Sequence, residues 1–103
     1  MTTIKVPKII YIGSHPYTIR FDSSLPDRQL NGELNRHKLE ISINPELVAS
    51  QMMEALIHEF VHTTEGIYYS GEAIPETGVN GISEGLTQIL RQLDIEFDWQ
   101  DIK

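Results

Sequence analysis

The chain has 103 residues, of which 40% are hydrophobic and 22% charged, a composition typical of one globular domain spanning residues 1–103. Its formal net charge of −7 and its scattered lysines and arginines argue against nucleic acid as a partner, because phosphate binding needs clustered basic side chains. The chain has no cysteine, so disulfides and thiolate metal sites are excluded. It shows no signal-peptide pattern and no long apolar run, so we expect no membrane segment and a cytoplasmic location.

The N-terminal part of the chain predicts two β-hairpins. Residues 4–21 contain β-branched and aromatic runs on either side of the turn-forming segment 13–16. Residues 32–34 lead through a polar turn into 39–43, where apolar and polar side chains alternate. Strands with one apolar face fit an antiparallel sheet that is covered on one side by helices.

A long helix is predicted to follow. Asn44, Pro45 and Glu46 have the residue types of a helix N-terminus, and Gly66 is expected to end the helix after about Glu65. Steps of 100° per residue give this helix one broad apolar face, formed by Ala49, Met53, Leu56, Ile57, Phe60 and Val61.

A second helix is predicted from about Glu76 to Leu93. It carries one apolar stripe, formed by Val79, Ile82, Leu86, Ile89, Leu90 and Leu93, which we expect to dock on the core. The glycines at 78, 81 and 85 border this stripe and are expected to let the two helices approach closely. The tail, 94–100, is either a last strand or a loop whose aromatic residues pack on the core. The sequence therefore predicts an α+β fold, with a small antiparallel sheet packed on two helices.

The long helix contains the pattern His58-Glu59-Phe60-Val61-His62, with both histidines on the side opposite its apolar face and Glu59 on the flank. Histidines four residues apart lie one helical turn apart, so both imidazoles can reach one ion. The glutamate between them is the general base, not a ligand, in zinc peptidases with the H-E-x-x-H pattern. Such a pattern arises by chance with odds on the order of one in a hundred at this composition, and its placement on the polar face favours a Zn²⁺ site.

A catalytic zinc ion needs a third protein ligand. The other two histidines, His15 and His37, fall in predicted turns, so a carboxylate is expected. Glu65 lies on the same helix, and ligands from one helix alone hardly surround an ion. Glu76 and Glu84 of the second helix both remain candidates, and Glu76 is favoured because it flanks the apolar stripe.

The pattern His58-Glu59-x-x-His62, Glu76-x-x-x-Asn80 and Gly85-Leu86-x-Gln88-x-Leu90 resembles the small HExxH zincins of phage and bacterial genomes, which are loosely grouped with ImmA/IrrE-type metallopeptidases. The resemblance covers roughly residues 31–93 and implies a zincin-like fold of the minimal gluzincin type. It implies His58, His62 and Glu76 as zinc ligands and Glu59 as the base. Asn80 stands where larger gluzincins carry an acid and is expected to hydrogen-bond a ligand. Thr63 stands where small zincins commonly carry alanine.

Two functions follow from these observations. The first is a zinc metallopeptidase that hydrolyses peptide bonds in a specific protein or peptide, with Glu59 activating water. An extended substrate would pair with an exposed strand at 39–43. Tyr68 and Tyr69 are candidates for stabilising the oxyanion, and packing is the alternative role for both. The alternative is a catalytically weak or inactive zincin-fold module that binds and regulates a protein partner. The sequence makes no prediction of oligomeric state.

Overall fold

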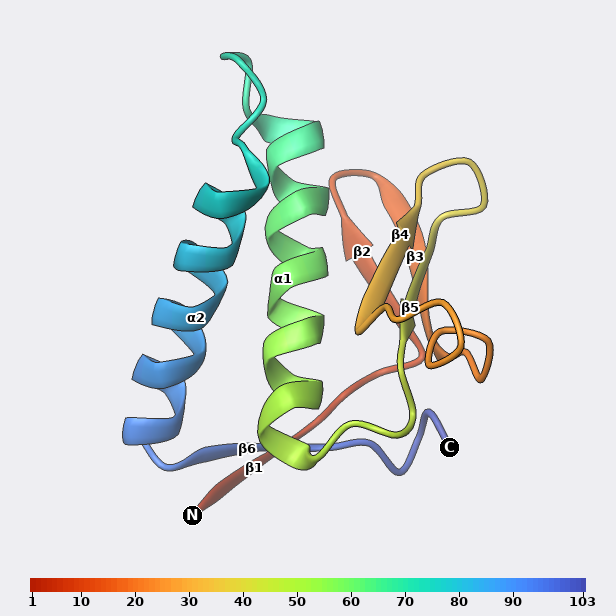
Figure 1. The fold of residues 1–103 in the computed structure, drawn as a ribbon, viewed down its shortest axis with the longest axis vertical. Coiled ribbons are helices and arrows are strands. Elements are labelled where there is room, and N and C mark those ends of the chain that lie inside the picture. Colours follow the sequence, from red (N-terminus) through yellow and green to blue (C-terminus); the bar gives the residue numbers. More distant parts are fainter.

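The computed structural model describes residues 1–103 and has an α+β fold in which two helices lie side by side next to a sheet (Figure 1). The elements are, in chain order, β1 (Thr2–Lys5), β2 (Ile9–Ile12), β3 (His15–Phe21), β4 (Gly32–Asn35), β5 (Glu40–Ile43), α1 (Ala49–Tyr68), α2 (Glu76–Gln92) and β6 (Ile95–Asp98). One sheet has the strand order β2-β3-β5-β4, and β1 pairs with β6 in a second sheet. The predicted α+β class is confirmed.

Both sheets contain a parallel pair, so the prediction of a purely antiparallel sheet is wrong. The two predicted hairpins are present, since β2 pairs with β3 and β4 pairs with β5 in antiparallel fashion. However, β3 pairs with β5 in parallel, with Ile19 opposite Ile41. The strand β5 is therefore an interior strand, and β2 and β4 are the two edge strands of this sheet. The expectation that residues 39–43 form an exposed edge is wrong for this reason.

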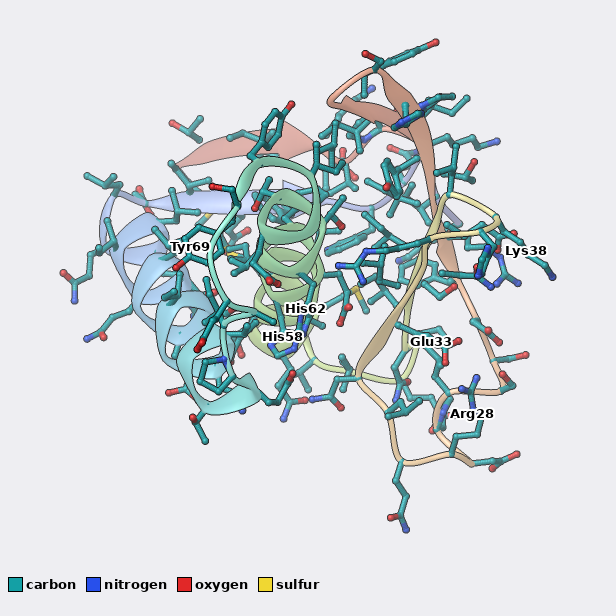
Figure 2. All side chains as sticks on the ribbon, turned by 90° about the horizontal axis from the view of Figure 1, so that it is seen from above. Arg28, Glu33, Lys38, His58, His62 and Tyr69 are labelled. Atoms are coloured by element: carbon teal, nitrogen blue, oxygen red, sulfur yellow. The ribbon has the colours of Figure 1, made fainter.

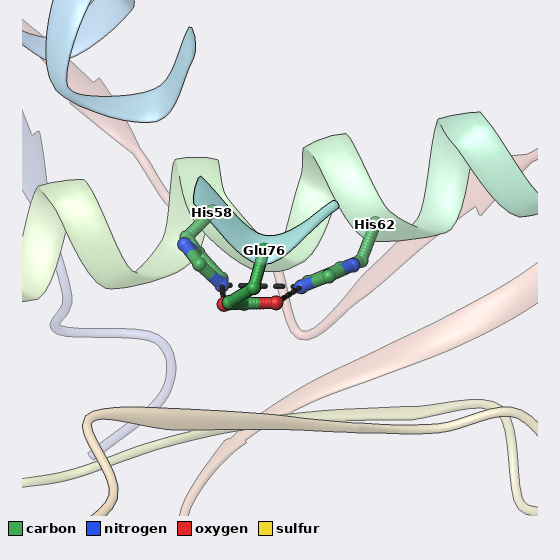
Figure 3. Close-up of side chains that lie close together, drawn as sticks. All are labelled: His58, His62 and Glu76. Carbon is green, nitrogen blue, oxygen red and sulfur yellow. Dashed lines mark hydrogen bonds and ion pairs between the residues drawn. The ribbon is translucent and has the colours of Figure 1, made fainter. Parts of the chain in front are cut away.

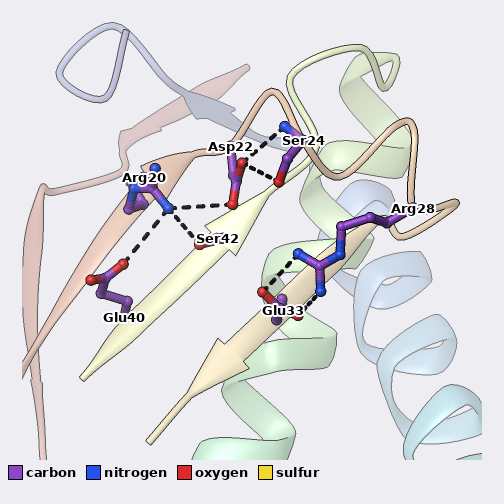
Figure 4. Close-up of polar contacts among 7 residues, drawn as sticks. All are labelled: Arg20, Asp22, Ser24, Arg28, Glu33, Glu40 and Ser42. Carbon is purple, nitrogen blue, oxygen red and sulfur yellow. Dashed lines mark hydrogen bonds and ion pairs between the residues drawn. The ribbon is translucent and has the colours of Figure 1, made fainter. Parts of the chain in front are cut away.

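The loop between β3 and β4 is ordered by short polar contacts (Figure 4). The Asp22 carboxylate accepts hydrogen bonds from the Ser24 backbone N–H at 2.9 Å and from its hydroxyl at 2.7 Å, which lower the pKa of Asp22. Arg28 forms an ion pair with Glu33 of β4, and the side chain of Leu25, in the same loop, is fully buried. These contacts fix the loop at the entrance to β4.

Helix α1 begins at Ala49, a few residues later than predicted. Asn44 has the residue type of a helix cap, but its side-chain oxygen accepts a hydrogen bond from the Glu46 N–H at 2.8 Å. Its amide group donates to the Leu30 carbonyl at 3.1 Å. The Asn-Pro-Glu sequence therefore forms a turn before the helix, as asparagine commonly does, and Val48 is the N-cap.

Helix α1 also continues past Gly66 and ends at Tyr68. The Arg36 guanidinium lies against Gly66 and donates to the His62 carbonyl at 2.9 Å. The Tyr68 hydroxyl accepts a hydrogen bond from the Gly13 N–H at 2.7 Å. Contacts with both hairpin turns thus stabilise the last turns of α1. The prediction that the helix ends at Gly66 did not take these tertiary contacts into account.

The core lies between α1 and the four-stranded sheet, with α2 on the other side of α1 (Figure 1). The tail forms a strand, β6, which pairs with β1 in register from Thr2 opposite Ile95 to Lys5 opposite Asp98. The buried core cluster comprises Val6, Ile12, Tyr17, Ile19, Ile41, Ile43, Met52, Ala55, Leu56 and Trp99. Neither helix has a segment long and apolar enough to cross a membrane.

Helix α2 docks on α1 through a different face from the one predicted. Its buried residues are Val79, Ser83 and Thr87. The two hydroxyl groups donate to carbonyls one turn earlier, each at 2.7 Å, so this small polar face can be buried with its hydrogen bonds satisfied. Gly81 and Gly85 face open space and take no part in the docking. Four residues of the predicted stripe are exposed instead: Ile82, Leu86, Ile89 and Leu93.

Candidate metal centre

The two histidines of the motif lie one turn apart on α1 and face the N-terminus of α2. Their Nε2 atoms are 3.1 Å from each other. Glu76, the first residue of α2, spans both rings: its Oε1 lies 2.8 Å from His58 Nε2 and its Oε2 lies 3.1 Å from His62 Nε2 (Figure 3). Residues from two helices therefore converge on one point.

The donor atoms of this cluster fit a tetrahedral zinc ion. Zinc bonds of about 2.0–2.1 Å place tetrahedral ligand atoms about 3.3 Å apart, close to the distances between these atoms. Two imidazoles and one carboxylate form a known catalytic donor set, which leaves one coordination position open. His58 and His62 are half-buried and the Glu76 side chain is 60% exposed, so that position can face the solvent.

Glu59 lies outside this donor cluster and points toward β4. It is 6% exposed and packs against Gly32, where a methyl group added to the glycine would lie 2.9 Å from Glu59 Oε2. Burial raises the pKa of Glu59 to about 7, with smaller contributions from the negative charges of Glu76 and Glu33. A carboxyl group with this pKa can both accept and donate a proton near neutral pH.

Two residues of the cluster, His58 and Glu76, line a cleft between α1, the start of α2 and the edge strand β4. The cleft has a volume of about 320 Å³ and a largely polar lining. Its residues are Gln29, Leu30, Asn31, Gly32, Gln51, Glu54, Ala55, His58, Glu59, Glu76 and Asn80. The free edge of β4 thus begins directly beside the glutamate of the motif.

The other candidate ligands lie apart from this cluster. Glu84 is exposed on α2, and Glu65 is not among the residues whose ligand atoms converge. His15 and His37 are exposed and are also outside the cluster. Among the acidic residues considered from the sequence, only Glu76 is brought to the two histidines.

The residues expected to assist the site lie differently from the prediction. Asn80 lines the cleft but makes no hydrogen bond to a histidine or to the Glu76 carboxylate. The Tyr68 hydroxyl is bonded to the Gly13 N–H, and Tyr69 lies outside the cleft lining. Sequence reasoning missed the role of Gly32. The sequence feature that could have indicated this role is the position of a glycine at the start of a predicted strand, because a glycine in a strand often marks the close approach of another group.

Comparison with protein-family models, with curated proteins and with solved structures finds no match to this chain. The resemblance to small zincins therefore rests on the motif residues, chiefly His58, Glu59, His62 and Glu76. The function has to be inferred from the geometry and chemistry of these side chains.

Proposed function

We propose that the chain is a zinc-dependent peptidase, a minimal zincin of the ImmA/IrrE type, which hydrolyses a peptide bond in a specific protein. The observation that carries the proposal is the convergence of His58, His62 and Glu76 on one point beside the buried carboxyl of Glu59. A purely structural metal site has no use for a carboxyl with a raised pKa next to its ligands.

His58, His62 and Glu76 would hold the zinc ion, which when bound supplies a Lewis acid that acidifies water and polarises a peptide carbonyl. The exposed Glu76 side chain leaves the cluster open to the cleft, where water and a peptide can enter.

Glu59 acts as the proton carrier of the reaction. Its carboxylate removes a proton from water while the water oxygen bonds to the carbonyl carbon of the peptide. The same carboxyl then delivers that proton to the amide nitrogen as the C–N bond breaks, which leaves an amine and a carboxylic acid, and the acid then ionises by releasing its own proton. In the metal-free chain burial raises the pKa of Glu59 to about 7, and a bound zinc ion beside it would lower this pKa towards that of a carboxylate base.

The free edge of β4 positions the substrate. An extended peptide adds to an exposed strand through main-chain hydrogen bonds, and β4 borders the cleft from Gly32 onward. The Asn80 amide lines the opposite side of the cleft and is available to donate to a substrate carbonyl. With one edge strand beside one small polar cleft, affinity must come from a complementary surface on a specific partner. The net charge of −7 favours a basic one.

One observation favours a second candidate, a zincin-fold module that binds a protein with little or no catalysis. Neither Tyr68 nor Tyr69 lines the cleft, so no tyrosine is placed there to stabilise an oxyanion. Loss of such a donor typically costs a hundredfold to a thousandfold in rate.

Elemental analysis of the purified protein tests the metal site. We expect about one zinc ion per chain, its loss in His58→Ala and His62→Ala, and its retention in Glu59→Gln, because a base is not a ligand. An empty site in Glu59→Gln would overturn the assigned roles.

Digestion of an unbiased peptide library tests the activity. Zinc-loaded wild type is compared with Glu59→Gln, which keeps the metal but lacks the base. We expect cleavage of few sequences, by the wild type only, with an efficiency that falls as salt rises. Efficient cleavage of many unrelated peptides would contradict the proposed specificity. No cleavage of any peptide or basic partner protein would favour the binding module.

A further inference from the structure

Helix α2 carries an apolar ridge that neither the fold nor the proposed site uses. We define the ridge as Ile82, Leu86, Ile89 and Leu93, which are exposed by 43, 43, 55 and 64%. At 100° per residue, their side chains lie within a narrow sector of the helix. Contiguous exposed apolar residues of this kind are typical of an interaction site.

An apolar groove runs beside this ridge, between α1 and α2. It has a volume of about 350 Å³, and seven of its eight lining residues are hydrophobic. The lining consists of Ile57, Phe60, Val61, Thr64, Leu86, Ile89, Leu90 and Phe97. Because Phe97 belongs to β6, the groove lies on the β6 side of the helix pair. His58 and His62 lie on the side of α1 away from β6 (Figure 2), so groove and cleft are on opposite faces.

The spacing of the ridge is symmetric. Its residues follow one another at intervals of four, three and four, so the series reads the same in both directions about a point between Thr87 and Gln88. A two-fold axis through this point places Leu86 opposite Ile89 of a second copy, and Ile82 opposite Leu93. An antiparallel helix pair with this four-three spacing meets along its apolar residues. A two-fold interface requires such a self-complementary surface.

The charges of the chain permit this contact despite its net charge of −7. No charged residue belongs to the ridge or to the groove lining. Glu84 and Arg91 point to the opposite side of α2. Gly85 flanks the ridge, and a methyl group added there would meet nothing within 4 Å, so a second helix can approach closely.

We propose that the protein is a two-fold dimer in which the α2 helices of two copies pair in antiparallel orientation. The ridge of each copy enters the groove of the other, with Leu86 of one copy against Ile89 of the other. Both clefts face outward and stay accessible. The dimer does not depend on zinc or on catalysis, so its failure would leave the proposed peptidase untouched.

Sedimentation equilibrium from micromolar to millimolar concentration tests the dimer. We expect the wild type to have twice the mass of the 11.8 kDa chain. Leu86→Glu and Ile89→Lys should each reduce the mass to that of one chain, because each places an unpaired charge in the interface. Gln88→Glu adds a negative charge, as Leu86→Glu does, but on the far side of α2. This control variant should remain dimeric. Circular dichroism verifies that each variant keeps its helices.

An equimolar mixture of Leu86→Glu and Ile89→Lys tests the register. Residue 86 of one chain opposes residue 89 of the other. The mixed dimer therefore pairs Glu with Lys at one of these contacts and Leu with Ile at the symmetry-related contact. We expect the mixture to recover the two-chain mass. If the wild type has the mass of one chain at every concentration, the proposal is overturned, and the ridge would then be a binding surface for a different protein. Variants that stay dimeric, or a mixture that stays monomeric, would also overturn it.

Discussion

The buried carboxyl of Glu59 should make the metal-free protein less stable as pH rises. Its pKa is about 7 in the folded chain against an ordinary value of 4.5, because burial, and then the charges of Glu76 and Glu33, disfavour the ionised form. Between these values the folded chain holds a proton that the unfolded chain has released, so stability falls with rising pH. The shift corresponds to about 3 kcal/mol, which is present below pH 4.5 and lost above pH 7.

Urea denaturation of wild type and Glu59→Gln in a chelator, over a series of pH values, measures this difference. The glutamine resembles the protonated carboxyl, so the variant should match the wild type at low pH and exceed its free energy of unfolding by about 3 kcal/mol at high pH. Groups that do not interact with Glu59 titrate equally in both proteins and cancel in the difference. Glu84→Gln removes an exposed carboxyl and should run parallel to the wild type. A constant difference between wild type and Glu59→Gln across the series would refute the reasoning.

Three further predictions concern the site. Glu76→Ala should weaken zinc binding by well over tenfold and Glu84→Ala should not, as measured by competition with a fluorescent chelator; the reverse order would make Glu84 the ligand. Gly32→Ala should destabilise the chain by about 1–3 kcal/mol, because the methyl group meets Glu59, whereas Gly81→Ala, in open space on a helix, should stabilise it by up to about 1 kcal/mol. Zinc at a hundredfold excess over its dissociation constant should raise the free energy of unfolding by about 2.7 kcal/mol, and an unchanged urea midpoint would exclude binding to the folded state.

The sequence predicted those parts of the fold that local patterns control. The two hairpins and α2 lie close to their predicted ranges, because turn residues and apolar alternation act over short distances. The parallel pairs β3–β5 and β1–β6 join segments that are distant in sequence, and no local pattern encodes such a choice. The predicted docking face of α2 is wrong because the prediction considered only how apolar the residues are. Close helix packing favours the small residues Val79, Ser83 and Thr87 instead.

The site likewise combines features set by local sequence with features set by contacts between distant segments. The spacing of His58 and His62 is a property of one helix, so their common direction could be predicted. Bringing Glu76 to them depends on how the segment 69–75 returns the chain to α1, and the sequence left Glu84 open for that reason. The packing of the Glu59 side chain against Gly32 depends on where β4 lies relative to α1, and sequence periodicity does not determine that position.

The pairing of β1 with β6 has a consequence for the order of folding. It joins the most distant strands of the chain, and the two-stranded ribbon has little stability without the core residues beneath it. We therefore expect it to form after the four-stranded sheet and the helices, and to open first under native conditions. Amide hydrogens of residues 2–5 should exchange faster than those of β5. Because neither β1 nor β6 contributes a residue to the cleft, such partial opening would leave the two histidines on an intact α1.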